Sequence, residues 1–291
     1  MPDLQISRKL PLDTRPKLFF CDVDRTLLTH DHKLLPTVSA AMRGLDAIDL
    51  PIILASARSP VGVERVHAEV GASDMVCCFN GAWIGNLRNR ETLRENRLDR
   101  DFALEAMSVV HSAGGSPIWF DLTCGYVLTP DEQVARRRTD VTGDDLALIR
   151  SPEDAPGAPF KLLATFPAGR ISDAVQSLSL TFANKLTVAQ SGPNLVELVS
   201  PDTRKDLAAA FLADARAIAV GDVVVAGDSD NDLEMLRWAG LAITVANAKP
   251  HIQSAADIVA PSCDDGGLAI ALEWLVQQVL QLSAEEVRAQ A

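Results

Sequence analysis

Residues 223–232 read VVVAGDSDND: four apolar residues, a glycine, and then a polar segment with three aspartates, one serine and one asparagine. Four successive apolar residues of this kind indicate a buried strand, and the polar residues then follow its carboxyl end. In open α/β sheets, ligands bind outside the carboxyl ends of the strands. The stretch therefore predicts a polar ligand site at one edge of an α/β sheet.

A second stretch near the start of the chain repeats this arrangement. Residues 18–21, LFFC, form another apolar run, and Asp22 and Asp24 follow it directly. Either acidic turn alone is a weak signal, because an aspartate after a strand is usually a turn or capping residue. Two such strand ends, however, can converge on one Mg²⁺, a cation that takes few carboxylates and leaves room for a phosphate. The pair therefore predicts a magnesium site that also accepts a phosphate.

Strands and helices alternate in the first part of the chain and again in the last part. Successive strand–helix–strand units of this length predict a parallel sheet with helices on both faces, a doubly wound, Rossmann-like α/β core. The expected strands lie at 17–22, 52–55, 75–79, 223–227, 241–246 and 258–261, and the expected helices begin near residues 36 and 60, span 205–219, 231–239 and 250–256, and run on from about 267.

The middle third of the chain differs in composition from the rest. It contains an Arg-, Asn- and Glu-rich stretch, a hairpin or bent strand, a Pro/Gly/Ala loop and two further strands, expected at 88–100, 118–128, 152–159, 160–166 and 186–189. This change predicts an inserted α+β domain over 84–190, within a core made of 1–83 and 191–291. Residues 1–16, with three prolines, are expected to form a loose lead-in.

The bulk composition is that of a globular protein that works in water. The chain has 291 residues, of which 47% are hydrophobic and 23% charged, as is usual for such proteins. No apolar run is long enough to span a membrane, and the first residues lack the apolar segment of a secretory signal. The five cysteines show neither C-x-x-C nor zinc-site spacing. We expect them to be small buried hydrophobes in a reducing cytoplasm.

The charge balance narrows the choice of partners. The formal net charge is −12, from 27 basic and 39 acidic residues. A field of this sign argues against nucleic acid and against anionic membranes as partners. It also opposes an anionic substrate at long range, so a phosphate site would need local positive charge. The sequence carries no signal for the oligomeric state.

Four short motifs follow one another along the chain. Residues 22–27 read DVDRTL, 54–58 read LASAR, Lys205 lies early in an expected helix, and 227–232 read GDSDND. In order and spacing they resemble motifs one to four of the haloacid-dehalogenase superfamily of phosphohydrolases. The resemblance covers nearly the whole chain from about residue 17 onward, and four ordered motifs are very specific.

Further segments are similar to the Cof-type branch of that superfamily. They are Asn80-Gly81-Ala82 at a strand end and the tail segments 245–248, 255–257 and 265–268. In this branch an α+β cap is inserted where the composition of this chain changes. The resemblance therefore implies a catalytic core with an inserted cap that closes over small phosphorylated substrates.

The resemblance also implies roles for the acidic residues. Asp22 would be the nucleophile that forms an aspartyl-phosphate. Asp24 would protonate the leaving oxygen and then activate water, while its backbone carbonyl would bind Mg²⁺. Asp22, Asp228 and Asp232 would complete the metal ligands, with Asn231 supporting water or phosphate. Asn231 and Asp232 can equally serve as helix-capping residues, because the first turn of a helix favours acids, and both roles can hold together.

Two more residues would bind the phosphoryl group. Ser56 would offer its hydroxyl and its backbone N–H, although a lone serine after a strand is usually an ordinary turn residue. Lys205 is unfavourably placed at the positive end of a helix dipole, which favours a functional role over a solvated lysine. The sequence departs from the family at Arg25 and Ala57, where glycine is the more common residue. Neither departure removes a reacting group, so they bear on turnover and substrate preference.

Several other residues have two interpretations. His30 and His32 flank Asp31 in a polar turn and could suggest a metal site, but an exposed loop is the simpler interpretation. Trp119 and Tyr126 could face the leaving group of the substrate or pack in a core, and Asp121 could join them at the substrate.

The function expected from these observations is that of a Mg²⁺-dependent phosphatase. It would hydrolyse phosphomonoesters of small metabolites, with sugar phosphates as the expected class, through a phospho-Asp22 intermediate. One alternative is a phosphosugar mutase of the same fold, which would need a bisphosphate activator. A second alternative is a catalytically silenced phosphate-binding protein, for which Arg25 is the only hint.

Overall fold

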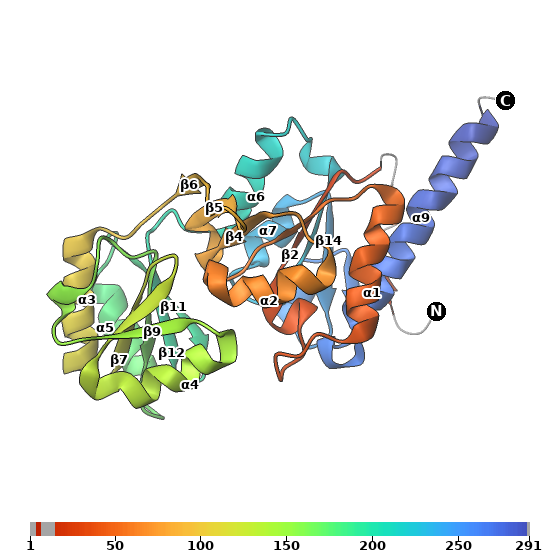
Figure 1. Ribbon diagram of the computed structural model, residues 1–291. Coiled ribbons are helices and arrows are strands. Elements are labelled where there is room, and N and C mark those ends of the chain that lie inside the picture. The colour runs from red at the N-terminus through yellow and green to blue at the C-terminus, as the bar shows by residue number, and fades with distance from the viewer. Residues whose placement is uncertain (1–3, 7–14, 290–291) are drawn as a thin grey trace. The chain divides into compact units, whose positions relative to one another are not determined.

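The computed structural model describes residues 4–6 and 15–289, which divide into two compact units. The first unit comprises residues up to Ser56, Arg65–Cys77 and the chain from Arg204 onward; the second comprises Ala57–Glu64 and Cys78–Thr203 (Figure 1). Each unit has its own sheet and its own covering helices. The interpretation of 84–190 as an inserted cap stays a prediction.

The first unit is built on a six-stranded sheet in the order β1-β15-β14-β13-β2-β3. Its strands from β15 to β3 run parallel, and only β1 at the edge is antiparallel. The apolar runs predicted as strands are almost entirely buried, as strands covered on both faces must be. The bounds are β1 (Gln5–Ile6), β2 (Leu18–Cys21), β3 (Ile52–Leu54), β13 (Val223–Ala226), β14 (Leu241–Val245) and β15 (Ile258–Ala260).

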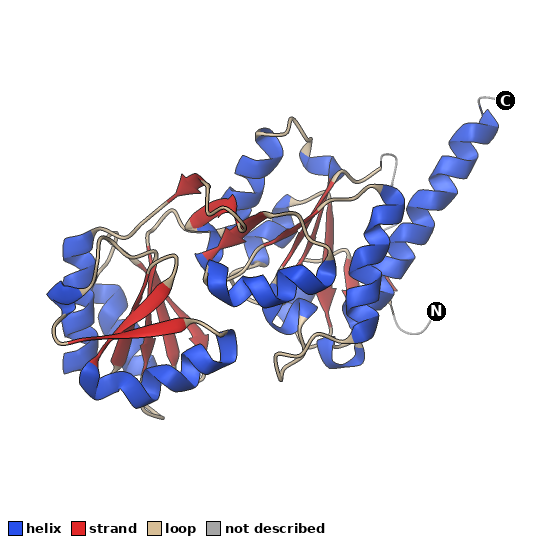
Figure 2. Ribbon diagram, viewed as in Figure 1, coloured by secondary structure: helices blue, strands red, loops and turns tan. Residues whose placement is uncertain are grey.

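After β2 the chain continues to β3 on one side of the sheet, and after β13 it continues to β14 on the other side. Right-handed crossovers then place the two sets of helices on opposite faces, and Figure 2 shows helices on both sides of the strands. α1 packs against α9, and α6 packs against α7. The doubly wound prediction is thereby confirmed. The helices are α1 (Pro36–Gly44), α2 (Pro60–Val70), α6 (Lys205–Asp214), α7 (Leu233–Trp238), α8 (Pro250–Gln253) and α9 (Gly267–Ala289).

Several helix ends differ from the sequence expectation. The helix expected over 205–219 ends at Asp214, and a turn follows in which Ala217 has a φ of 53°. No glycine or proline marks that stop, so residue pattern alone does not predict it. The helices expected to start at 231 and to end at 256 instead start at Leu233 and end at Gln253. The third expected strand is β4 (Met75–Cys78), which continues the parallel arrangement through a bridge between Ala55 and Cys77.

The second unit is built on a mixed six-stranded sheet in the order β11-β12-β10-β7-β8-β9. The expected hairpin over 118–128 is confirmed as β7 and β8, and the strands expected near 160 and 186 are β10 and β11. A short hairpin of β5 and β6 precedes them. The bounds are β5 (Trp83–Asn86), β6 (Thr92–Glu95), α3 (Arg100–Ser112), β7 (Ser116–Phe120), β8 (Cys124–Leu128), α4 (Glu132–Thr142), β9 (Asp145–Ile149), β10 (Lys161–Thr165), α5 (Ile171–Thr181), β11 (Thr187–Gly192) and β12 (Leu195–Val199).

The aromatic residues of this second sheet settle one open interpretation. Trp119 is completely buried in the core between the sheet and helices α3 and α5, so it packs rather than faces solvent. Tyr126 is partly buried against the same core, and its hydroxyl donates to Asp121 at 3.0 Å. Burial and the neighbouring Asp121 raise the pKa of Tyr126 to about 12. Core packing is therefore the better account of both aromatic side chains.

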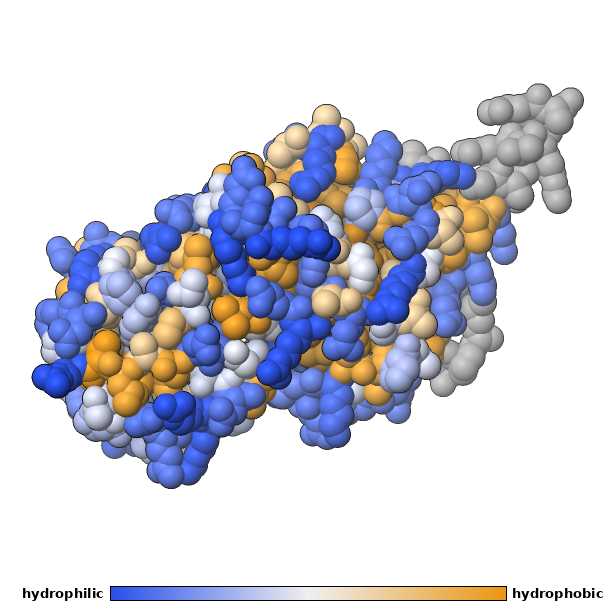
Figure 3. All heavy atoms as spheres, viewed as in Figure 1, coloured by the Kyte–Doolittle hydropathy of each residue, from blue (hydrophilic) through white to orange (hydrophobic). Residues whose placement is uncertain are grey.

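Two features concern the chain ends and the surface. Within 1–16, Gln5–Ile6 forms the edge strand beside β15, while residues 1–3 and 7–14 lie outside the described residues. None of the helices in the described ranges combines the length and apolarity that a bilayer span requires. Hydrophilic residues make up much of the face drawn in Figure 3, and single exposed apolar residues such as Leu180 are normal on protein surfaces.

The turn after β2 contains a backbone conformation that glycine would adopt more easily. Val23–Leu27 forms a wide helical turn in which Arg25 has φ 63° and ψ 6°, the left-handed region. An L-residue with a Cβ pays about 1–2 kcal/mol for this conformation. Asn247 holds the turn from outside, because its side-chain amide donates to the Arg25 carbonyl at 3.0 Å. The family's usual glycine at this position therefore has a structural reason.

Replacing Arg25 with glycine should stabilise the protein. We expect Arg25→Gly to raise the free energy of unfolding by about 0.5–1 kcal/mol, since relief of the left-handed strain exceeds the extra entropy of a glycine in the unfolded chain. The control is Arg25→Ala, which removes the same side chain but keeps a Cβ. Equal stability of the two variants in urea unfolding with EDTA present would show that Arg25 carries no such strain.

Candidate active site

The two acidic turns meet at the switch point of the sheet. β2 and β13 are parallel neighbours in which Cys21 pairs with Ala226, so both strands end at the same level. The Asp22 amide donates to the Ala226 carbonyl at 2.9 Å, which places Asp22 beside the segment that begins with Gly227. The connections that follow β2 and β13 run to opposite sides of the sheet, which makes this a switch point. Open α/β sheets bind ligands in the crevice at such a point.

Lys205 joins the two turns through a buried network of ion pairs. Its ammonium donates to Asp22 Oδ1 and, at 2.7 Å, to Asp232 Oδ1. The Lys205 side chain is 0% exposed although it lies at the first turn of α6. Burial alone would lower the pKa of Lys205, but the Asp22 and Asp232 carboxylates outweigh it and raise that pKa. Lys205 is therefore a fixed positive charge against the carboxylate of Asp22.

Asp232 organises the loop between β13 and α7. Its Oδ2 accepts the backbone N–H groups of Asp228, at 3.2 Å, and of Ser229, at 3.0 Å. A Cβ placed on Gly227 would come within 2.5 Å of the Asp232 side chain, so only glycine allows this close approach. Both oxygens of Asp232 are thus engaged by Lys205 and by the loop.

The cluster contains more negative charge than its own residues neutralise. One oxygen each of Asp22, Asp228 and Asp232 lie within 4.8 Å of one another, and Lys205 is the ammonium that faces them. Burial, together with Asp232 and Asp228 and against the opposing effect of Lys205, raises the pKa of Asp22 well above its ordinary range. Burial first and then Asp232 raise the pKa of Asp228 to about 6.

A divalent cation fits this arrangement. Asp22 Oδ2 is buried and has no hydrogen-bond partner among the described residues, and such an atom is costly unless a ligand satisfies it. A doubly charged ion would balance three carboxylates against one ammonium. Clustered carboxylate oxygens are the donors that hard cations such as Mg²⁺ and Ca²⁺ prefer.

The remaining predicted site residues lie on segments next to this cluster. Ser56 follows β3, is completely buried and donates its N–H to the Cys77 carbonyl at 2.8 Å. The expectation that this N–H would bind a phosphoryl oxygen is therefore wrong, because it already pairs with the neighbouring strand, and only the role of the hydroxyl stays a prediction. Asp24 lies half-buried in the turn after Asp22, and Asn231 is exposed just before α7. The structure therefore brings Asp22, Lys205, Asp228 and Asp232 into direct contact or close approach. Asp24, Ser56 and Asn231 lie on adjoining segments: the turn after Asp22, the end of β3 and the loop between Asp228 and Asp232.

Three residues at this site were not assigned a role from the sequence. His32 Nδ1 lies 2.9 Å from Asp24 Oδ1, so this part of the polar turn does not simply point into solvent. Thr26 donates its hydroxyl to Asp228 Oδ1 at 3.2 Å. Asn247 holds the Arg25 carbonyl. The motifs contain Thr26, but the partners of His32 and Asn247 depend on loop paths that periodicity does not reveal.

Comparisons with known proteins agree with this geometry. The family described as haloacid dehalogenase-like hydrolase matches residues 19–272. A protein of Haemophilus influenzae that is named a phosphatase by inference is 28% identical over 259 residues, covering 88% of this chain and 97% of that protein. A phosphoglycolate phosphatase of Archaeoglobus fulgidus is 26% identical, covering 90% of this chain and 97% of that protein.

Solved structures share the fold. A haloacid dehalogenase-like hydrolase from Bacteroides thetaiotaomicron superposes with a TM-score of 0.82 at 22% identity, covering 90% of this chain and all of that one. The subclass IIB sugar phosphatase BT4131 gives a TM-score of 0.75 at 19% identity, covering 88% of this chain and 98% of that one. With the family match over residues 19–272, these findings show that the chain belongs to the haloacid dehalogenase-like hydrolases, in the Cof-type branch of phosphoric monoester hydrolases.

Proposed function

We propose that this protein is a Mg²⁺-dependent phosphatase that hydrolyses phosphomonoesters of small metabolites, with sugar phosphates as the substrate class. The observation that carries the proposal is the buried carboxylate cluster around the Lys205 ammonium, in which Asp22 Oδ2 finds no hydrogen-bond partner in the described part of the chain. Relatives named as a phosphoglycolate phosphatase and a sugar phosphatase support the substrate class. Free, mostly buried cysteines support a reducing cytoplasm as its location.

In this proposal Asp22 and Asp24 divide the chemistry. An Asp22 oxygen attacks phosphorus, the bond from phosphorus to the leaving oxygen breaks, and Asp24 gives that oxygen its proton. Asp24 then takes a proton from water, whose oxygen attacks phosphorus and releases phosphate from Asp22. Ser56 and Lys205 hold the phosphoryl oxygens, with Asn231 beside them, so that fixed charges face the transferring group.

Mg²⁺ would be held by Asp22, Asp228 and the backbone carbonyl of Asp24. When bound, it would supply positive charge to the phosphoryl oxygens and to the nucleophile. Asp232, predicted as a further ligand, already accepts from Lys205 and from two backbone amides. Its proposed part is therefore to hold Lys205 and the 228–229 loop in place, next to the cation.

The first test is phosphate release from a panel of sugar phosphates and one aryl phosphate, with Mg²⁺ and with EDTA. We expect release that needs Mg²⁺ and falls at least about a thousandfold in Asp22→Asn, which keeps the shape but removes the nucleophile. The matched control is Asp230→Asn, an exposed acid of the same loop that bonds Lys249 and His251. It should change activity less than about threefold, since exposed ion pairs contribute little.

The outcome discriminates among the alternatives. Release from none of the panel by a folded protein would sink the general phosphatase proposal. Conversion between phosphate isomers that needs a bisphosphate activator would indicate the mutase. Binding of phosphate without turnover would indicate the silenced protein.

The pKa values predict how Mg²⁺ changes stability with pH. Asp228 has a folded pKa of about 6, above the value of about 3.9 for an unfolded aspartate. In the metal-free native state Asp228 therefore holds its proton to higher pH than in the unfolded state, and its contribution to stability falls as pH rises from about 4 through about 6. Mg²⁺ needs the ionised carboxylates, so it should raise the melting temperature more near pH 7.5 than near pH 5.

Thermal unfolding with Mg²⁺ or EDTA at both pH values checks this prediction. The wild type should show the pH-dependent difference, and Asp228→Asn should lose most of the Mg²⁺ effect. Equal stabilisation at both pH values, or full stabilisation of Asp228→Asn, would place the cation elsewhere.

His32 is expected to position Asp24 as the proton donor. An alkyl leaving group needs that proton far more than an aryl leaving group does. We expect His32→Ala to lower kcat/KM for a sugar phosphate about tenfold and to change that for the aryl phosphate little. The control is Asp31→Asn on the same exposed turn, which should leave the ratio of the two substrates unchanged. An equal loss on both substrates would assign His32 a structural role only.

A further inference from the structure

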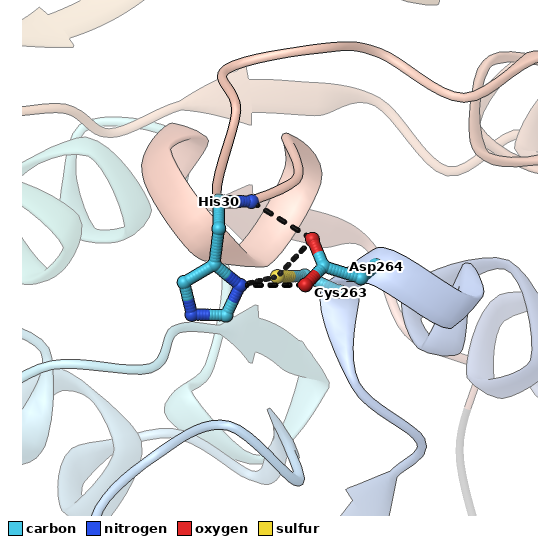
Figure 4. Close-up of side chains that lie close together, drawn as sticks. All are labelled: His30, Cys263 and Asp264. Atoms are coloured by element: carbon cyan, nitrogen blue, oxygen red, sulfur yellow. Dashed lines mark hydrogen bonds and ion pairs between the residues drawn. The ribbon is translucent and has the colours of Figure 1, made fainter.

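A second cluster of metal-ligating side chains lies in the first unit, where two loops meet. His30 belongs to the turn that follows Leu28, and Cys263 and Asp264 belong to the helical turn Cys263–Asp265 after β15. Figure 4 shows the imidazole, the thiol and the carboxylate converging on one point. One ligand atom from each of the three lies within 4.8 Å of the others.

The distances between these atoms suit a tetrahedral ion. His30 Nδ1 lies 3.5 Å from Cys263 Sγ and 2.9 Å from Asp264 Oδ2, and Cys263 Sγ lies 3.8 Å from Asp264 Oδ1. Zinc–ligand bonds of about 2.0–2.3 Å at tetrahedral angles require separations of about 3.3–3.6 Å between neighbouring ligand atoms. The two distances to Asp264 involve different oxygens of its carboxylate, so one oxygen must turn toward the ion and the 2.9 Å contact must lengthen to give three corners of such a site.

The backbone around the cluster is held in place by hydrogen bonds. Asn247 Oδ1 accepts from the Cys263 amide at 2.9 Å, and the Ser262 hydroxyl accepts from the Asp264 amide. The His30 amide donates to Asp264 Oδ1 at 2.9 Å, which ties the two loops together. The ligand side chains are therefore presented by anchored segments, as a binding site requires.

A nucleophilic Cys–His–Asp arrangement does not explain the cluster. The same imidazole nitrogen, Nδ1, contacts both the thiol and the carboxylate, whereas a relay needs one ring nitrogen for each partner.

From this geometry we propose that His30, Cys263 and Asp264 form a second metal site, for a zinc-class divalent cation, distinct from the carboxylate cluster around Asp22. A thiolate with an imidazole selects Zn²⁺ and its chemical relatives, whereas all-oxygen donors suit Mg²⁺. The side chains of His30 and Asp264 are 44% and 50% exposed, so the ion can enter from solvent and keep water as its fourth ligand. Binding releases the thiol proton to solvent.

Cobalt titration of the full chain, freed of metal by chelation, tests the site directly. Bound Co²⁺ should give a thiolate-to-cobalt charge-transfer band that saturates at one equivalent, is displaced by Zn²⁺ and is not displaced by Mg²⁺. Cys263→Ser should abolish the band. Cys124→Ser, the matched control at a partly exposed thiol of the second unit, should keep it.

Two further variants keep the proposal testable if Cys263→Ser fails to fold. His30→Gln and Asp264→Asn change exposed side chains and should weaken Co²⁺ binding at least about tenfold. Asp228→Asn should keep the band, because the carboxylate cluster offers no sulfur. Absence of the band in folded wild-type protein at excess Co²⁺, or its survival in Cys263→Ser, would overturn the proposal. Neither outcome depends on the reaction that the protein catalyses.

Discussion

The buried contact of Lys205 with Asp22 and Asp232 is the interaction on which the first unit depends. Removing three charged groups from water costs several kcal/mol for each, and only close pairing returns that energy. The three side chains come from segments far apart in the chain, so the pairing forms only when β2, α6 and the loop after β13 are all in place. Loss of one partner would leave an uncompensated buried charge, which typically costs about 3–5 kcal/mol.

This constraint explains why unfavourable local features gather at one place. Gly227 must lack a side chain to admit Asp232, and Arg25 is held in a left-handed conformation. Asp22 Oδ2 is buried and meets no hydrogen-bonding group of residues 4–6 or 15–289. Elsewhere the parallel strands of this sheet are buried and mostly apolar, and only the short edge strand β1 is exposed. Features that cost stability and recur at one sheet edge indicate selection for ligand binding rather than for stability.

The sequence predicted the core and the strand ends well. The reason is that neighbouring parallel strands that end at the same level place their carboxyl ends side by side at one edge of the sheet. It also predicted that Lys205 would not be a solvated lysine, since its place in the helix dipole is unfavourable. It missed β12, where the buried Glu197 interrupts an apolar run and is compensated by Lys161 and Asn80. Side-chain partners across loops depend on chain paths that no periodicity encodes.

The loop contacts show that residues without a reacting group shape the active turn. The segment after Leu28 sends His32 to Asp24 and His30 to Asp264. Asn247 holds the Arg25 carbonyl with its amide nitrogen and the Cys263 amide with its oxygen. The turn that carries Asp24 is therefore fixed from two sides by segments near the end of the chain. Because Asn247 and Asp264 contact the segment on either side of Asp24, the geometry of the first acidic turn depends on loops near the end of the chain as well as on its own sequence.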